Sequence, residues 1–262
     1  MSVSWQHLET YIQRMSESLP DKLFFLEYLD DTVDTIVDYG CADGTLLKAI
    51  HDSPLKDNYK LIGYDISKEM IEIAKSSNKD IFFTNDWQEV LSICSSRNAC
   101  INFSSVIHEL VSEVSWNTFK NFCQEIAERF YMISIRDMGM ENKAIREARS
   151  SIDYYQAIKD KGYQNYFDDV LHKYYLGREN NNIGVITEFL LKYPFQENWE
   201  NEIKEHYLHV TLEDSKALFS SNFEFTSVYQ ESYCLEYVYQ RIKKDFGINV
   251  TWGTHYKLLL RR

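Results

Sequence analysis

The segment 35-TIVDYGCADGTLLKAI-50 places an acid and a tight turn of small residues between a short apolar run and an amphipathic run. Asp38 lies near the end of the apolar run, and Gly40, Ala42 and Gly44 follow at alternate positions. This spacing differs from the G-x-G-x-x-G pattern of dinucleotide-binding turns, and the lysine of a phosphate-binding loop is missing. The turn therefore indicates a ligand of another kind.

Two further acids follow the next two strand-like runs. Asp65 comes 21 residues after Gly44 in GYDIS, and Asp86 lies in TNDW. An acid at the end of the second strand can accept hydrogen bonds from both hydroxyls of a ribose. Because the carboxyl ends of parallel strands meet at one ligand-binding edge, Asp38 is expected beside these two acids. Three carboxylates would repel a pyrophosphate, and they suit a cationic nucleoside without phosphate.

This constellation resembles the class I S-adenosylmethionine-dependent methyltransferases over residues 31–140. The resemblance implies S-adenosyl-L-methionine as the cofactor. The acid and the turn backbone would approach its methionine part, whose carboxylate suits the turn amides and the start of the following helix. These residues are Asp38, Gly40, Ala42 and Gly44. Glycine is commonest at the position of Ala42, and alanine fits there if its φ is negative.

The resemblance assigns four more residues to the nucleoside. Asp65 would accept from the ribose hydroxyls, and Ile66 would pack on the adenine. Asp86 would accept from the adenine amino group, with Trp87 nearby. The acids also have structural alternatives, because Asp38 can cap the turn and Asp65 can cap the next helix.

The segment 102-NFSSVIHEL-110 resembles the fourth motif of the same family, in which the first four residues, Ser104 among them, line the site near the sulfonium. Methyl transfer is an in-line displacement, so the protein mainly has to position the acceptor. His108 and Glu109 are the candidate catalytic residues, because an imidazole that titrates near neutrality can take a proton from a hydroxyl or an amine. In the alternative interpretation His108 begins the next helix or is a buried structural imidazole.

Arg136 and Asp137 end the next strand-like run, in SIRDMGM. They are predicted to pair with each other; in the alternative, Arg136 binds a carboxylate or phosphate of the acceptor. No acidic cluster has the spacing of a magnesium site, so the sequence implies no metal. The Asn/Asp-Pro-Pro-Tyr/Phe motif of base-amino methyltransferases is absent after the fourth strand, which disfavours that reaction.

Strand-like and helix-like runs alternate along the chain. Strands are expected at 35–40, 60–66, 80–85, 99–107, 130–136, 223–233 and 254–262. Helices are expected at 4–18, 21–30, 44–52, 67–76, 87–94, 116–129, 211–222 and 234–246. This alternation predicts an α/β fold with a doubly wound, seven-stranded, mostly parallel sheet that ends in an antiparallel strand pair.

The predicted organisation has N-terminal helices at 1–30, a core at 31–140 and 211–262, and a helical insert at 141–210. Helices within the insert are expected at 142–160, 163–176 and 184–192. The insert leaves the sheet after the fifth strand, so it is a natural lid over the acceptor. Its many tyrosines are predicted to form its core, with an acceptor pocket or a dimer surface as alternatives.

The composition narrows the class of protein. A formal net charge of −12 disfavours a nucleic-acid partner. Five scattered cysteines without a CxxC spacing indicate reduced thiols and a cytoplasmic location. No apolar run approaches the roughly 18 residues that span a bilayer, so no membrane partner is expected. A homodimer is compatible with the sequence.

Together these features predict an S-adenosylmethionine-dependent methyltransferase that acts at oxygen or nitrogen of a small or medium-sized acceptor. One alternative is an RNA or protein methyltransferase whose insert binds a large partner. Another is a non-catalytic cofactor-binding or assembly protein.

Overall fold

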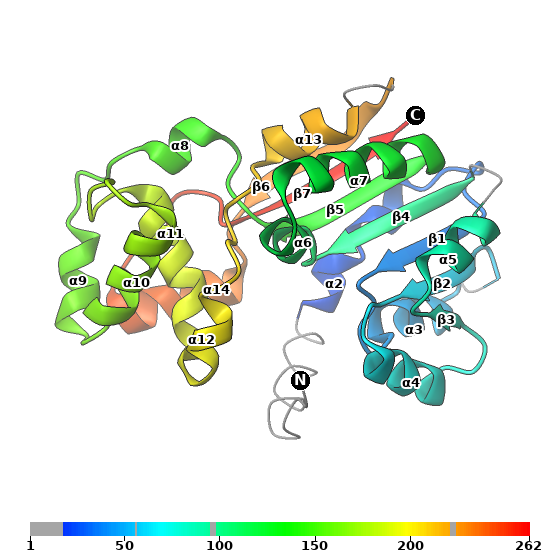
Figure 1. The fold of residues 1–262 in the computed structure, drawn as a ribbon, viewed down its shortest axis with the longest axis horizontal. Helices are drawn as coiled ribbons and strands as arrows, with labels where there is room; N and C mark the ends of the chain where they lie inside the picture. Colours follow the sequence, from blue (N-terminus) through cyan, green and yellow to red (C-terminus); the bar gives the residue numbers. More distant parts are fainter. Residues whose placement is uncertain (1–17, 56, 95–97, 221–223) are drawn as a thin grey trace.

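The computed structural model describes residues 18–55, 57–94, 98–220 and 224–262. A seven-stranded sheet with the order β3-β2-β1-β4-β5-β7-β6 forms its centre (Figure 1). The strands are β1 (Thr35–Tyr39), β2 (Lys60–Tyr64), β3 (Phe82–Thr84), β4 (Ala99–Ser104), β5 (Met132–Met138), β6 (Thr226–Tyr233) and β7 (His255–Arg261). β1 to β5 are parallel, and β7 runs antiparallel between β5 and β6. The predicted fold class is confirmed.

The central strands feed two separate cores, because successive side chains of a strand point to opposite faces. On β1, Ile36 enters one core and Val37 the other, and on β4 Cys100 and Ile101 divide in the same way. The Val37 face packs against α5 (Trp87–Ile93), α6 (Ile107–Glu113), α7 (Trp116–Arg129) and α13 (Leu212–Ser220). The Ile36 face packs against α2 (Leu19–Lys22), η1 (Phe24–Tyr28), α3 (Thr45–His51) and α4 (Lys68–Ser77).

The remaining helices gather beside the sheet, at the left of Figure 1. They are α8 (Lys143–Glu147), α9 (Tyr154–Asp160), α10 (Gln164–Tyr174), α11 (Ile183–Lys192), η2 (Tyr193–Asn198), α12 (Trp199–Glu202) and α14 (Glu236–Phe246). Residues 141–210 and α14 are called the insert lobe below. Phe167, Phe189 and Phe246 share its apolar core, so α14 packs on the insert although it connects two strands of the sheet. Within the described residues, none of the helices has both the length and the apolarity needed to cross a membrane.

Three predicted elements differ from the structure. The helix expected at 21–30 is instead the short α2, which begins at Leu19, followed by the 3-10 helix η1. The helix expected at 142–160 is interrupted after α8, where Ala148 is extended and Arg149 forms a β-bridge with Asn182. The strand expected at 99–107 ends at Ser104. Both interruptions come from contacts with residues distant in sequence, which local patterns do not record. The helix predicted at 4–18 lies, apart from its last residue, outside the described residues.

Candidate active site

The turn between β1 and α3 is built from left-handed backbone. Gly40, Ala42 and Gly44 have φ values of +76°, +46° and +79°. Glycine adopts such values readily, whereas alanine is strained there. The condition under which alanine would fit this position without strain, a negative φ, is therefore not met. The N–H of Ala42 donates to Asp65 Oδ2 at 2.9 Å, and this bond helps to hold the residue in its strained conformation.

Asp65 follows β2 and connects the turn to the start of α4. Its two oxygens accept from the N–H groups of Ala42 at 2.9 Å and of Ser67 at 2.8 Å. Ser67, which accepts from Met70 N–H, is the N-cap of α4, so Asp65 is not the cap. Each carboxylate oxygen has a second lone pair, which remains available to a ligand hydroxyl. The neighbouring side chain, Ile66, is 80% exposed.

Asp38 is buried in the sheet rather than displayed at its edge. Its Oδ1 accepts from Asn102 Nδ2 at 2.9 Å, and Asn102 Oδ1 accepts from Ser134 Oγ at 3.0 Å. Burial raises the pKa of Asp38 to about 7, although the bond from Asn102 and the charge of Lys22 act in the opposite direction. Asn102 was expected to line the site, but it is fully buried in this network. The network ties β1, β4 and β5 together directly before the turn.

Asp86 and Trp87 begin α5 next to the end of β3. Asp86 is exposed and caps the helix by accepting from the amide two residues on, at 2.9 Å. Trp87 is half-buried against Tyr39 and Tyr64, with ring centroids 5.1 and 5.2 Å away. Its Nε1 is buried without a hydrogen-bond partner among the described residues. The two tyrosines end β1 and β2, and motif comparison did not identify this aromatic group.

The backbone between β4 and α6 turns sharply beside the glycine turn. The Oγ of Ser104 is buried without a partner in the part of the chain that is described. Ser105 has a φ of +60°, its N–H donates to the carbonyl of Arg136, and its Oγ accepts from Arg136 Nη1 at 2.8 Å. Val106 lies so close to Gly40 that a Cβ on that glycine would be 2.9 Å from Val106 Cγ2. The start of α6 is thus packed on the turn.

Arg136 and Asp137 do not pair with each other, so this prediction is wrong. Successive residues of β5 point to opposite faces of the sheet, which already follows from the strand pattern. Arg136 Nε donates to Asp21 at 2.8 Å, and Lys257 Nζ lies 2.6 Å from the same carboxylate. Asp137 is fully buried and faces α6.

His108 is held by Asp137 through two hydrogen bonds. The backbone N–H donates to Asp137 Oδ2 at 3.1 Å, and Nδ1 lies 2.7 Å from Oδ1. Because an ionised carboxylate only accepts, Nδ1 carries a hydrogen and Nε2 is the nitrogen that faces away from Asp137. Burial disfavours the charged imidazole, but Asp137, with Glu109 and Glu205, more than offsets this and raises the pKa of His108 to about 9. The imidazole is buried, as one alternative held, yet its second nitrogen points toward Glu205.

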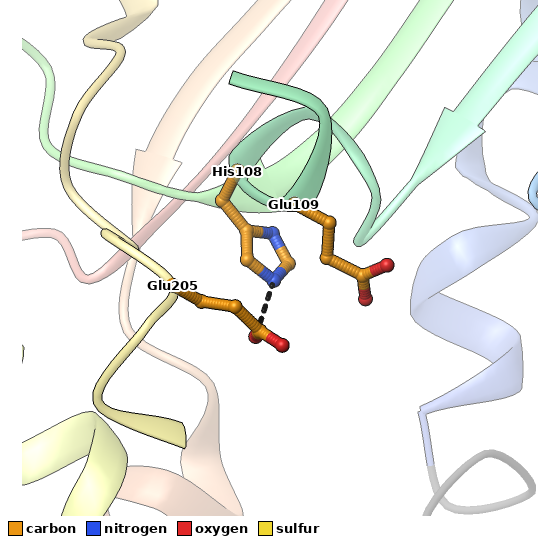
Figure 2. Close-up of side chains that lie close together, drawn as sticks. All are labelled: His108, Glu109 and Glu205. Carbon is orange, nitrogen blue, oxygen red and sulfur yellow. Dashed lines mark ion pairs between the residues drawn. The ribbon is translucent and has the colours of Figure 1, made fainter. Parts of the chain in front are cut away.

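Figure 2 shows His108 and Glu109 from α6 converging with Glu205, which comes from the segment after α12. His108 Nε2 and Glu205 Oε2 are 3.8 Å apart, and the ligand atoms of all three side chains lie within 4.8 Å of one another. Partial burial and the charge of Glu205 raise the pKa of Glu109 to about 7, although His108 acts in the opposite direction. Glu205 was missed from the sequence, because nothing in WENEIKEHYLH distinguishes it from the neighbouring glutamates.

The segment that carries Glu205 is anchored on α11. Glu188 and Lys192 are fully buried, and their charged groups are 3.4 Å apart. Glu188 accepts from the backbone N–H groups of 207–208 at 2.8 and 3.0 Å. Lys192 Nζ donates to the carbonyls of Glu202 and Glu205 at 2.9 and 2.6 Å. The insert lobe therefore holds Glu205 against α6 with buried charged groups.

The tyrosines of the insert lobe form both a core and the wall of a cavity. Tyr154 and Tyr193 are buried in the core. A cavity of about 210 Å³ is lined by residues that include Tyr174, Tyr175 and His206. Tyr174 stacks on His206 with ring centroids 4.3 Å apart.

The comparison with protein families gives a match, which covers the first three strands of the sheet. Residues 30–96, which include β1 to β3 and both acidic loops that follow them, match a family described as a methyltransferase domain. Residues 30–96 therefore match a methyltransferase domain, and the sheet as a whole has the fold of the class I methyltransferases. The strand order and the antiparallel end of the sheet agree with this assignment. S-adenosyl-L-methionine is the cofactor of such domains. A search of curated proteins found no match to the chain.

Solved structures share the fold of this methyltransferase over nearly its whole length. An S-adenosylmethionine-dependent methyltransferase from Archaeoglobus fulgidus is 12% identical with a TM-score of 0.51, over 97% of this chain and 94% of that chain. One from Mesorhizobium loti is 13% identical with a TM-score of 0.51, over 94% and 97%. The plantazolicin methyltransferase BamL, in complex with a triazolic desmethylPZN analog and SAH, is 10% identical with a TM-score of 0.51, over 99% and 91%. At these identities the likeness establishes a common fold.

Proposed function

We propose that this methyltransferase transfers the methyl group of S-adenosylmethionine to an oxygen or nitrogen of a small or medium-sized acceptor by in-line displacement. One observation carries the proposal. His108 and Glu109 from α6 meet Glu205 from the insert lobe, so the sheet side and the insert lobe both contribute polar groups to one place. The start of α6 packs on the glycine turn through Val106. Such convergence is what an acceptor site between a cofactor domain and a lid requires.

The residues at the strand ends fit the cofactor. Ile66 offers an exposed apolar side chain for the adenine, next to the available lone pairs of Asp65 for the ribose hydroxyls. Asp86 offers an exposed carboxylate for the adenine amino group. The buried Asp38 supports the turn from behind. The proposed cofactor-binding residues are Asp38, Gly40, Ala42, Gly44, Asp65, Ile66, Asp86, Trp87 and Ser104.

His108 and Glu109 are proposed to activate the acceptor. An acceptor O–H or N–H must lose its proton for methylation to be complete, and the bond to Asp137 places His108 Nε2 on the side of the insert lobe. Because the pKa of His108 is raised to about 9, the imidazole has to release its own Nε2 hydrogen before it can accept that proton. The insert closes on this place through buried contacts, which favours an acceptor small enough to be enclosed. The similar fold of BamL, solved with a triazolic desmethylPZN analog, supports the same choice.

The proposal is tested by measuring SAH formation with panels of small hydroxyl and amine compounds, RNA and proteins. We expect turnover with a small compound. His108→Asn is expected to lower kcat by about 10²–10⁴-fold with an unchanged Kd for SAH. His172→Asn, an exposed histidine of the insert lobe, is the matched control and should leave both constants unchanged. Methylation of RNA or protein alone, or cofactor binding without any turnover, would refute the proposed acceptor class.

A further inference from the structure

We propose that His108, Glu109 and Glu205 bind a divalent metal cation, of which Mn²⁺ and Mg²⁺ are the best candidates. The inference rests on the proposed function, because it states how the acceptor is activated there. Two ligand atoms bound to one cation at about 2.1 Å lie at most about 4.2 Å apart. The 3.8 Å between His108 Nε2 and Glu205 Oε2 fits this limit, and a carboxylate oxygen of Glu109 lies within 4.8 Å of both atoms.

The orientation of His108 is a separate observation that points to a ligand. The residue is 4% exposed, and its Nε2 has no hydrogen-bond acceptor within reach among the described residues. The buried Asp137 takes Nδ1–H at 2.7 Å and so directs Nε2 into the cluster. A carboxylate that holds one imidazole nitrogen and presents the other is the usual outer partner of a metal-binding histidine.

The charge around the cluster calls for a cation. Glu109, Glu205, Asp137 and Glu202 all lie near His108, and Glu202 Oε1 is buried without a hydrogen-bond partner in the described part of the chain. Lys192 is close, but its ammonium donates to the carbonyls of Glu202 and Glu205. A bound cation would balance carboxylates that the local protein groups leave in excess.

The donor set also defines the acceptor. One imidazole and two carboxylates occupy one side of a cation and leave positions open on the other, as suits Mn²⁺ or Mg²⁺ with exchangeable oxygen ligands. An acceptor with a hydroxyl next to a second oxygen can chelate through both. The bound hydroxyl releases its proton to water, and its oxygen bonds to the methyl carbon. The C–S bond breaks, and its electron pair goes to sulfur, so the sulfonium becomes a neutral thioether.

The test is a titration of EDTA-treated, full-length protein with Mn²⁺, followed by electron paramagnetic resonance and by calorimetry. We expect about one Mn²⁺ per chain, with affinity weakened at least about tenfold in Glu205→Gln. Glu200→Gln removes an equally charged but exposed carboxylate of the insert lobe and should bind as the unmodified protein does. Absence of Mn²⁺ binding up to about 1 mM, or equal affinity in Glu205→Gln, would overturn the inference.

SAH binding and turnover are measured on the same samples. Retained SAH binding with full turnover in EDTA would refute the proposed cation site. The methyltransferase proposal would still stand, with the His108–Asp137 pair acting directly as the base. Loss of SAH binding in the unmodified protein would instead refute the proposed function, whatever the Mn²⁺ result.

Discussion

The buried pair on α11 gives the sharpest prediction about how the insert lobe completes the site. Lys192→Met keeps most of the side-chain volume but removes the ammonium. Glu188 then keeps its charge in a fully buried place without its cation, and the carbonyls of Glu202 and Glu205 lose their donor. Because Glu205 faces His108, the segment loosened by this change is the one that delivers a site residue.

The expected effect can be worked from these contacts. Removing one partner of a buried ion pair costs about 3–5 kcal/mol, and each buried carbonyl left without a donor costs about 1–3 kcal/mol before relaxation. Water entry offsets part of the sum, so Lys192→Met should lower the free energy of unfolding by about 3–5 kcal/mol. In Glu188→Gln/Lys192→Met neither member of this buried pair carries a charge. The double variant should therefore be less destabilised than the sum of the single variants by about 1–3 kcal/mol.

Urea unfolding measures these free energies, and hydrogen exchange gives a local readout. The amides at 207–208, which donate to Glu188, should exchange faster in both single variants than in the unmodified protein. Lys159→Met, an exposed lysine of the insert lobe, is the control and should stay within about 0.5 kcal/mol. A loss below about 1 kcal/mol for Lys192→Met, or strict additivity in the double variant, would refute this account of the anchor.

Two further predictions concern the cofactor side. In Gly44→Ala the new Cβ would lie 2.7 Å from Phe83 Cζ at a φ of +79°, so urea unfolding should show a loss of about 2–4 kcal/mol. Gly247→Ala, with a φ of +70° and nothing within 4 Å, should lose only about 1 kcal/mol, and equal losses would contradict the packing argument. The second prediction is that Asp38→Asn stabilises the fold as pH rises. The pKa of Asp38 is raised from 3.8 to about 7 in the folded protein. The loss of folding free energy that comes from burying its ionised carboxylate is therefore absent below pH 3.8 and complete above about pH 7. Urea unfolding should therefore show a variant that gains a few kcal/mol over the unmodified protein between pH 4 and pH 8, and a gain independent of pH would refute the burial argument.

The fold and the neighbouring positions of the three strands that carry the acids were predictable because their signals are local. Short β-branched runs alternate with amphipathic ones, and this alternation fixes a parallel sheet. Asp38, Asp65 and Asp86 lie at or directly after the ends of three strand-like runs, and these strands are neighbours in the sheet. Even here the pattern does not determine whether an acid is buried, as Asp38 is, or exposed, as Asp86 is.

The acceptor side was less predictable because tertiary contacts decide it. Glu205 is one of several glutamates in a polar segment, and only the anchor on α11 brings it to His108. Asp21, the partner of Arg136, lies 115 residues away in the chain. The positive φ of Ala42 depends on a hydrogen bond to Asp65 across the turn. The opposite orientation of Arg136 and its neighbour, in contrast, was available from strand geometry alone.

The central claim is that the acids at the ends of neighbouring strands hold S-adenosylmethionine, and calorimetric titration with SAH tests it most directly. The unmodified protein should bind with a micromolar Kd. Asp65→Ala, which removes charged acceptors for the ribose hydroxyls, should weaken binding by about 10–100-fold. Asp80→Ala removes an exposed carboxylate that precedes β3, at the opposite edge of the sheet, and should leave the Kd unchanged. Absence of binding heat with the unmodified protein, or an equal Kd in Asp65→Ala, would contradict the account.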